Sequence, residues 1–308
     1  MASLQELLVE KIKRLDSIPK KFLTDVEKSQ YQILDSILER LSKLTLTKDG
    51  KVEMSVANLK RAESITEDLQ SVLMKSDYIE AVTDFSSAFD IQKKVSDKYF
   101  EKAFPEFKDI ESEFADAVFE ATKRNAVETL ASSTITTKFL EPLKQQIDNI
   151  VTSGMDYKEA VKMLREYAVG DGETNGKLLQ YSSQIAYDSI AQTDAAYTSA
   201  IGDEIDAEWY YYAGGLIPTS RDFCIQRDSQ YFHYREVESW AKLNWKGKAE
   251  NTTSQNIWQY RGGYNCNHSL IPVSIDQVPK NVIIRNKRNG NYEPTKFDLE
   301  NLTTLQDE

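Results

Sequence analysis

The chain of 308 residues contains two cysteines and two histidines, and all four lie between positions 224 and 268. They are Cys224, His233, Cys266 and His268. Two thiolates and two imidazoles can fill the tetrahedral shell of a zinc ion, and a shell without a vacancy is typical of structural zinc. Cys266 and His268 are two residues apart, so on a strand both would face the same side. The cluster therefore predicts a zinc site.

The spacing of these residues leaves two other interpretations open. Eight residues separate Cys224 from His233 and thirty-two more precede Cys266, unlike the compact cysteine pairs of common zinc modules. The cysteines can instead be small buried apolar side chains, with the histidines held by ordinary hydrogen bonds. A disulfide is the other alternative, although so few cysteines fit a reducing compartment better.

Known catalytic motifs are scarce in this sequence. It has no G-x-S-x-G elbow, no glycine-rich phosphate loop ending in Lys-Ser/Thr and no H-E-x-x-H helix. The alternative function is a metal-dependent nuclease or hydrolase that uses His233, Asn265 and His268, with a histidine activating water. This arrangement lacks a convincing acidic partner, so we expect no enzymatic turnover.

A basic segment overlaps the same region. Residues 242 to 288 hold eight Lys and Arg against two acidic residues, a net charge of +6 in a chain whose net charge is -11. Interleaved tryptophans and tyrosines would suit contact with DNA phosphates or with an acidic protein surface. The candidate contacts are Lys242, Lys246, Lys248, Arg261, Arg285, Lys287 and Arg288. The other interpretation is a solvated, slightly basic face.

The elements before this region are expected to be long helices, because residues 1 to 150 contain one glycine and three prolines. Apolar residues at three- and four-residue spacing predict helices over 3–17, 22–44, 55–75, 78–104, 109–131, 143–151, 156–170 and 178–205. We expect the second helix to begin after Pro19, with Thr24 and Glu27 as a capping box. Residues 132–137 suit a linker, and Asp156 suits a helix cap.

The composition changes after residue 205, where all four tryptophans and several glycines predict short strands and loops. We expect strands over 208–212 and within 265–275. The predicted fold class is mainly α. Residues 1–177 form a long-helix N-terminal domain, 178–279 a small α+β domain, and 280–308 an extended tail.

The bulk properties exclude some classes of protein. We find neither a signal peptide nor an uninterrupted apolar run of about eighteen residues, so we expect a soluble protein without a membrane partner. The acidic net charge disfavours wholesale wrapping of nucleic acid, since phosphate binding needs clustered Lys and Arg.

Three segments stand between residues 190 and 272: Ile190-Ala191-Gln192-Thr193-Asp194, Arg221-Asp222-Phe223-Cys224 and residues 264–272. Together they resemble the Mu F-like phage head morphogenesis family. Ile190-Ala191-Gln192-Thr193-Asp194 is similar to that family's Ile-Ala-Arg-Thr-Glu signature, with departures at Gln192 and Asp194. The segment Arg221-Asp222-Phe223-Cys224 resembles its Arg-x-x-Cys element. Residues 264–272 resemble its closing Asn-Cys-x-Cys stretch that ends in proline, with His268 in place of the second cysteine.

This resemblance implies a minor capsid protein of low copy number that associates with the phage portal protein during procapsid assembly. Contacts with the major capsid protein, a scaffold protein or packaged DNA follow from the same resemblance. The protein would be assembled in the host cytoplasm and reside in the virion head. Similar domains can be fused to enzymatic modules in host-directed toxins, but no further catalytic module is visible in these residues.

Overall fold

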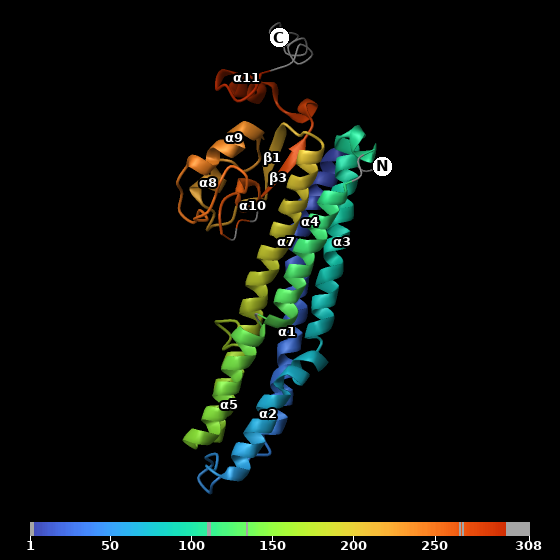
Figure 1. Cartoon of the computed structure of the whole chain (residues 1–308). Coiled ribbons are helices and arrows are strands. Elements are labelled where there is room, and N and C mark those ends of the chain that lie inside the picture. The colour runs from blue at the N-terminus through green and yellow to red at the C-terminus, as the bar shows by residue number, and fades with distance from the viewer. Residues whose placement is uncertain (1–2, 110–111, 134, 265, 267, 294–308) are drawn as a thin grey trace. The chain divides into compact units, whose positions relative to one another are not determined.

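The computed structural model, which describes residues 3–109, 112–133, 135–264, 266 and 268–293, confirms a mainly α fold with a small antiparallel sheet (Figure 1). The first part of the chain contains the following elements: α1 (Leu4–Leu41), α2 (Val56–Lys75), α3 (Tyr78–Ala103), η1 (Pro105–Asp109), α4 (Glu113–Glu128), η2 (Thr129–Ser133), η3 (Thr136–Leu140), α5 (Glu141–Ser153), α6 (Tyr157–Ala168) and α7 (Lys177–Glu204). None of the helices in the described ranges combines the length and apolar character that crossing a bilayer requires.

The short elements follow in the C-terminal part. They are β1 (Trp209–Ala213), α8 (Asp222–Ile225), β2 (Gln230–His233), α9 (Tyr234–Ser239), η4 (Trp240–Lys242), α10 (Ile257–Tyr260), β3 (Ser269–Val273), η5 (Ile275–Gln277) and α11 (Lys280–Arg288). The strands predicted at 208–212 and within 265–275 are confirmed as β1 and β3. Strand β2 has no counterpart among the predicted elements.

The predicted start of a second helix after Pro19 is wrong, because α1 continues through this proline. The Thr24 hydroxyl donates to the backbone carbonyl of Lys20, 3.0 Å away, and so forms no capping box. Proline removes one backbone donor from a helix. Ile18 and Phe22, on either side of Pro19, are buried on the same apolar face of α1. Their burial stabilises the helix although Pro19 donates no backbone hydrogen bond.

The predicted linker at 132–137 is also wrong where the structure describes it. Wide π-helical turns, η2 and η3, occupy most of this stretch and connect α4 to α5. Leu130, Ile135 and Phe139 are fully buried, and the Tyr78 hydroxyl donates to the carbonyl of Leu130 at 3.0 Å. The stretch is therefore helical because its apolar side chains are buried, although its hydroxyl and β-branched residues favour a linker.

The chain divides into two compact units that interleave in sequence. One comprises Ser17–Asp90 and Arg124–Tyr187, and the other comprises Met1–Asp16, Ile91–Lys123 and Asp188–Glu308. The predicted boundary at residue 177 does not coincide with this division. Helices α1, α3, α4 and α7 contribute residues to both units.

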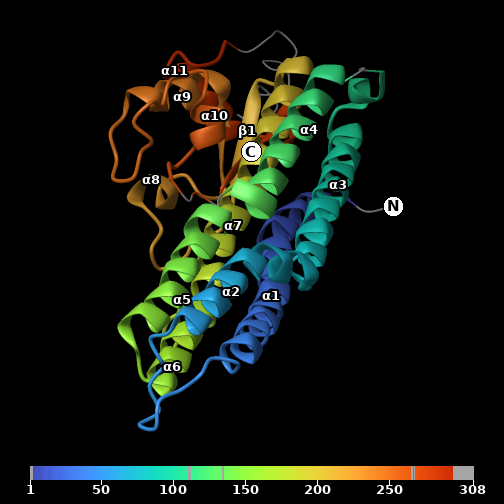
Figure 2. The ribbon, with the colours of Figure 1, turned by 60° about the horizontal axis from the view of Figure 1, so that its bottom comes forward.

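In the unit built around residues 17–90 and 124–187, α2 and α5 pack against each other (Figure 2). The predicted cap at Asp156 is confirmed, since its carboxylate accepts the backbone N–H groups of Lys158 and Glu159 at 2.9 and 3.2 Å. An isolated bridge between Leu46 and Val52 closes the turn after α1.

The other unit contains the sheet, in the strand order β2-β1-β3, with both pairs antiparallel. The C-terminal end of α7 approaches the sheet closely at Gly202, where a Cβ would lie 2.7 Å from the Tyr210 hydroxyl. The Tyr99 hydroxyl of α3 donates to the carbonyl of Pro272 in β3 at 2.9 Å. These contacts hold β1 and β3 against the helical part of this unit.

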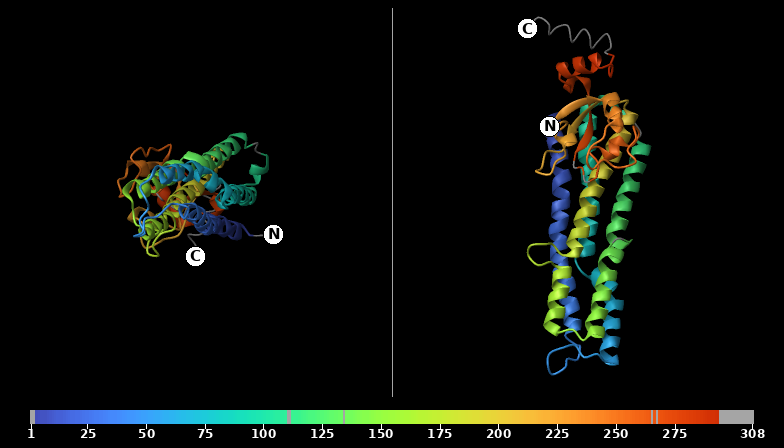
Figure 3. Two further views of the ribbon diagram at one scale, coloured as in Figure 1. Left: turned by 90° about the horizontal axis from the view of Figure 1, so that it is seen from below. Right: turned by 90° about the vertical axis from the view of Figure 1, so that its left-hand side faces the viewer.

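The predicted extended tail is helical at its start. Helix α11 covers residues 280–288, drawn in red in Figure 3, and it contacts β2. Ile283 and Tyr292 are buried beside Trp209. An apolar face within a polar stretch therefore anchors this segment. The remainder of the tail, residues 294–308, lies outside the described residues.

A buried ion pair joins the helices of the same unit. The ammonium of Lys11 contacts the carboxylate of Asp194, and both side chains are almost completely buried. Lys11 also donates to the Ser96 hydroxyl at 2.8 Å, and the Gln92 amide donates to Asp194 at 3.1 Å. Asp194, one of the departures from the family signature, therefore has a structural role here.

Candidate metal centre

The two faces of the sheet determine which of the four predicted ligands can meet. Successive residues of a strand point to opposite faces. Tyr210 and Tyr212 of β1 pack in a core with Cys224 and Cys266. Trp209 belongs to a second core, with Val273 and Tyr292. Only residues on the Tyr212 face can therefore join the thiol groups.

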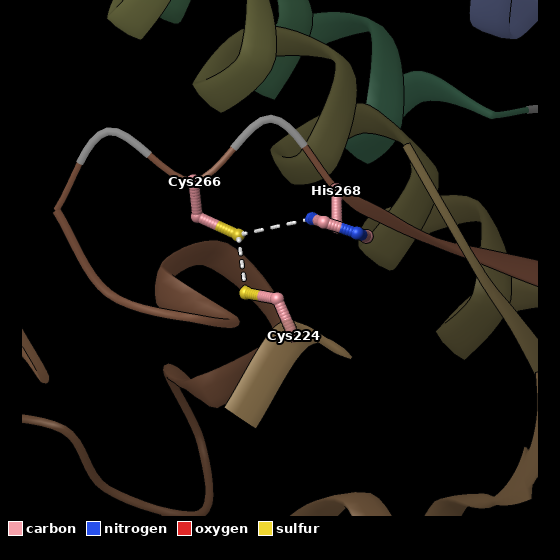
Figure 4. Close-up of side chains that lie close together, drawn as sticks. All are labelled: Cys224, Cys266 and His268. Carbon is pink, nitrogen blue, oxygen red and sulfur yellow. Dashed lines mark hydrogen bonds between the residues drawn. The ribbon is translucent and has the colours of Figure 1, made fainter. Parts of the chain in front are cut away.

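Three of the four predicted ligands converge on that face (Figure 4). Cys224 comes from α8, Cys266 from the segment between α10 and β3, and His268 immediately precedes β3. The Sγ atoms of the two cysteines lie 3.9 Å apart, and Sγ of Cys266 lies 3.8 Å from Nδ1 of His268. All three ligand atoms lie within 4.8 Å of one another, so the cluster could hold a metal ion.

The prediction that His233 completes this site is wrong. His233 pairs with Trp209 in the β1–β2 register, and its ring packs edge-on against the Trp209 ring, on the opposite face of the sheet. Its Nδ1 accepts the backbone N–H of Arg235. Burial, with a smaller effect from Arg235, lowers the pKa of His233 to about 4. His233 is thus a neutral core residue, and Asn265 of the nuclease alternative lies outside the described residues.

Two residues that the sequence analysis missed surround the cluster. The Tyr212 hydroxyl lies 3.6 Å from each sulfur, and its ring stacks on the His268 imidazole with centroids 4.7 Å apart. The carboxylate Oδ1 of Asp228 lies 3.1 Å from Nε2 of His268. Alternation along β1 could have pointed to Tyr212, whereas no sequence pattern connects Asp228 to a histidine forty positions away.

The hydrogen bond between the two thiols shifts their pKa values in opposite directions. The hydrogen bond from Cys224 lowers the pKa of the Cys266 thiol well below its ordinary value, with smaller contributions from His268 and Arg261 in the same direction. The same hydrogen bond, together with burial, raises the pKa of Cys224. Burial also raises the pKa of Tyr212 well above 10.0, so its hydroxyl stays protonated. Of the two thiols, Cys266 is therefore the one that ionises first.

The absence of a side chain at Gly262 makes room for the cluster. A Cβ on Gly262 would overlap the sulfur of Cys224 and lie 2.8 Å from that of Cys266. The preceding residue, Arg261, has a positive φ of 48°, which is uncommon for a residue with a side chain. Its guanidinium donates to the carbonyls of Ala191 and Cys266 at 3.0 and 3.3 Å, which ties Cys266 to α7.

The structure divides the predicted basic contacts into two groups. Arg261 is buried, so the prediction that it contacts DNA or a partner surface is wrong. Lys248 donates to the carbonyls of Ala241 and Leu243, and Arg285 forms an ion pair with Glu236 at 3.6 Å. The exposed members are Lys242, Lys246, Lys287 and Arg288.

Comparison of the chain with protein-family models, with curated proteins and with solved structures found no match.

Proposed function

We propose that Cys224, Cys266 and His268 bind one zinc ion with a structural role. The single observation that supports this proposal is their spacing. Two thiolates at about 2.3 Å from a tetrahedral zinc ion lie about 3.8 Å apart, and a thiolate and an imidazole nitrogen about 3.6 Å apart. In this chain the Cys224–Cys266 and Cys266–His268 distances are 3.9 and 3.8 Å, and the ligand atoms of Cys224 and His268 lie within 4.8 Å of each other.

The choice of zinc follows from the chemistry of the ligands. Calcium and magnesium prefer oxygen ligands, whereas thiolates together with imidazole suit zinc. Three protein ligands leave one position to water or to the Tyr212 hydroxyl, an arrangement that catalytic zinc also uses. The structural role therefore rests on burial, because Cys224, Cys266 and His268 are only 3%, 6% and 3% exposed.

Cobalt substitution tests the metal proposal, because cobalt reports its ligands by its visible spectrum. We expect wild-type protein loaded with cobalt to show thiolate charge-transfer bands and the intense visible bands of a tetrahedral ion. Cys266→Ser should lose the charge transfer from one thiolate. His233→Gln is the matched control and should retain the full spectrum. A wild-type spectrum like that of aqueous cobalt would overturn the proposal.

We also propose that the chain is a minor capsid protein of a phage head, a structural component that associates with the portal protein. The family-like segments at 190–194, 221–224 and 264–272 support this proposal. In the structure, the second and third supply the thiol and imidazole groups of one cluster, and Asp194 of the first lies in a buried ion pair. A rigid domain of this kind is suited to docking on a partner.

Co-expression with the portal protein of the same phage tests this second proposal. We expect the two proteins to co-purify through a tag on the portal and to separate when the zinc ligands are replaced. Absence of any complex with the wild-type chain would overturn it. Metal-dependent cleavage of DNA that is lost in Cys266→Ser would favour the nuclease alternative instead.

A further inference from the structure

The two nitrogens of the His268 ring face different groups. Nδ1 faces the Cys266 sulfur at 3.8 Å, and Nε2 faces Oδ1 of Asp228 at 3.1 Å. The side chains of His268 and Asp228 are 4% and 15% exposed, so this pair is largely shielded from water. The two sides of one imidazole are therefore turned toward a thiol cluster and a carboxylate.

The carboxylate determines where the ring carries its proton. An ionised carboxylate only accepts hydrogen bonds, so the nitrogen that faces it must be the N–H donor. In a neutral imidazole the other nitrogen then bears the lone pair. For His268 that nitrogen is Nδ1, the atom that points toward the sulfurs. Metal-binding histidines characteristically donate their second ring N–H to such a partner.

We propose that Asp228 is a positioning residue of the metal centre, which holds His268 as its Nε2–H tautomer so that Nδ1 binds the metal. This inference rests on the proposed metal site. Stacking of the Tyr212 ring on the imidazole fixes the plane of His268, while Asp228 selects which ring nitrogen is the N–H donor.

Asp228 also connects the metal centre to the loop that follows β1. The oxygen that faces His268, Oδ1, accepts the backbone N–H of Gly215 at 3.1 Å, and Oδ2 accepts the Ser229 hydroxyl at 3.1 Å. The backbone N–H of Asp228 itself donates to the carbonyl of Cys224 at 2.8 Å. One carboxylate thus holds an imidazole ligand and the loop at Gly215, so its loss should loosen both.

Metal affinity and histidine NMR together test this role. We would titrate zinc into wild-type protein, Asp228→Ala, Asp228→Asn and the control Asp222→Asn, which removes an exposed charge from α8. Loss of such a partner typically weakens metal binding about 10- to 100-fold. We expect this loss in Asp228→Ala, a smaller one in Asp228→Asn, whose amide oxygen still accepts Nε2–H, and none in the control.

NMR of histidine labelled with nitrogen-15 reports the tautomer of the ring, which a purely structural role of Asp228 would leave unchanged. The chain has two histidines, so His233→Gln assigns the signals of His268. We expect Nδ1 of His268 to be bound to metal and Nε2 to be protonated, and we expect faster amide exchange at Gly215 in the Asp228 variants. Should Asp228→Ala fail to fold, Asp228→Asn carries the comparison.

The possible failures are distinguishable. Zinc bound through Nε2, or bound equally well by wild type and by both Asp228 variants, would overturn the role of Asp228 while leaving the metal site intact. Wild-type protein that binds no zinc would overturn both proposals.

Discussion

Replacing Gly262 by alanine adds one methyl group at the place where the two thiol side chains meet. The new Cβ would overlap the Cys224 sulfur and lie 2.8 Å from the Cys266 sulfur. Non-bonded heavy atoms prefer separations of about 3.5 to 4.0 Å, so each sulfur must move away from the new Cβ by roughly 1 Å. Metal–ligand distances tolerate only about 0.2 Å. The backbone cannot easily retreat, because the Gly262 carbonyl accepts the Trp245 indole N–H at 2.9 Å.

We therefore expect Gly262→Ala to weaken zinc binding by about a hundredfold or more, which corresponds to about 2.7 kcal/mol. Crowding alone should lower the free energy of unfolding by about 1–3 kcal/mol. Competition with a zinc-binding dye measures the first quantity and chemical denaturation the second. Gly290→Ala is the control for zinc binding alone, because a Cβ there meets no atom within 4 Å, whereas its positive φ of 72° strains a residue with a side chain and lowers stability by itself. Wild-type zinc affinity in Gly262→Ala would refute this account of the site.

Three further predictions concern residues around the site and in the core of the same unit. His233→Gln should bind zinc normally. Because burial lowers the pKa of His233 to about 4 from 6.5, unfolded chains take up the proton first, and the neutral histidine stabilises the fold fully above pH 6.5. About 3 kcal/mol of this stability is lost as the pH falls toward 4. In His233→Gln, the free energy of unfolding from denaturation curves should vary less with pH between 6.5 and 4. An unchanged pH dependence would contradict the prediction. Lys11→Met should lower the free energy of unfolding by about 3–5 kcal/mol because it leaves Asp194 buried and unpaired, whereas Lys11→Met with Asp194→Leu should recover most of the loss. Equal losses in the single and double variants would argue against a coupled pair. Arg261→Ala should destabilise the fold, while Lys246→Ala, on an exposed side chain, should change stability by no more than about 0.5 kcal/mol. A stable Arg261→Ala that instead loses DNA binding would restore the surface role.

The helices were predictable because their apolar spacing is regular, and the predicted helices over 178–205 and 156–170 agree with α7 and α6 to within about two residues. The errors arose where long-range burial overrides local signals. Pro19 predicts a break, but the apolar face of α1 continues on both sides of it. The hydroxyl-rich residues 132–137 predict a linker, yet buried Ile135 and Phe139 hold helical turns there.

The residue types and the segment of the candidate site were predictable, but the exact set of residues was not. Scarce cysteines and histidines in one segment pointed to Cys224, Cys266 and His268. His233 was included wrongly because strand β2 was not foreseen, and the register of β2 with β1 decides which face His233 occupies. A shift of one residue in register would reverse that face. Asp228 was missed because its partner lies forty positions away and only the folded chain brings the two together.

The central claim is that three side chains hold one metal ion, and native mass spectrometry of the intact chain tests it most directly. Protein purified under reducing conditions without added chelator should carry one zinc ion per chain. The ion should persist in His233→Gln and be lost when Cys224, Cys266 or His268 is replaced. A folded wild-type chain whose mass shows no bound metal, even after incubation with zinc, would contradict the account.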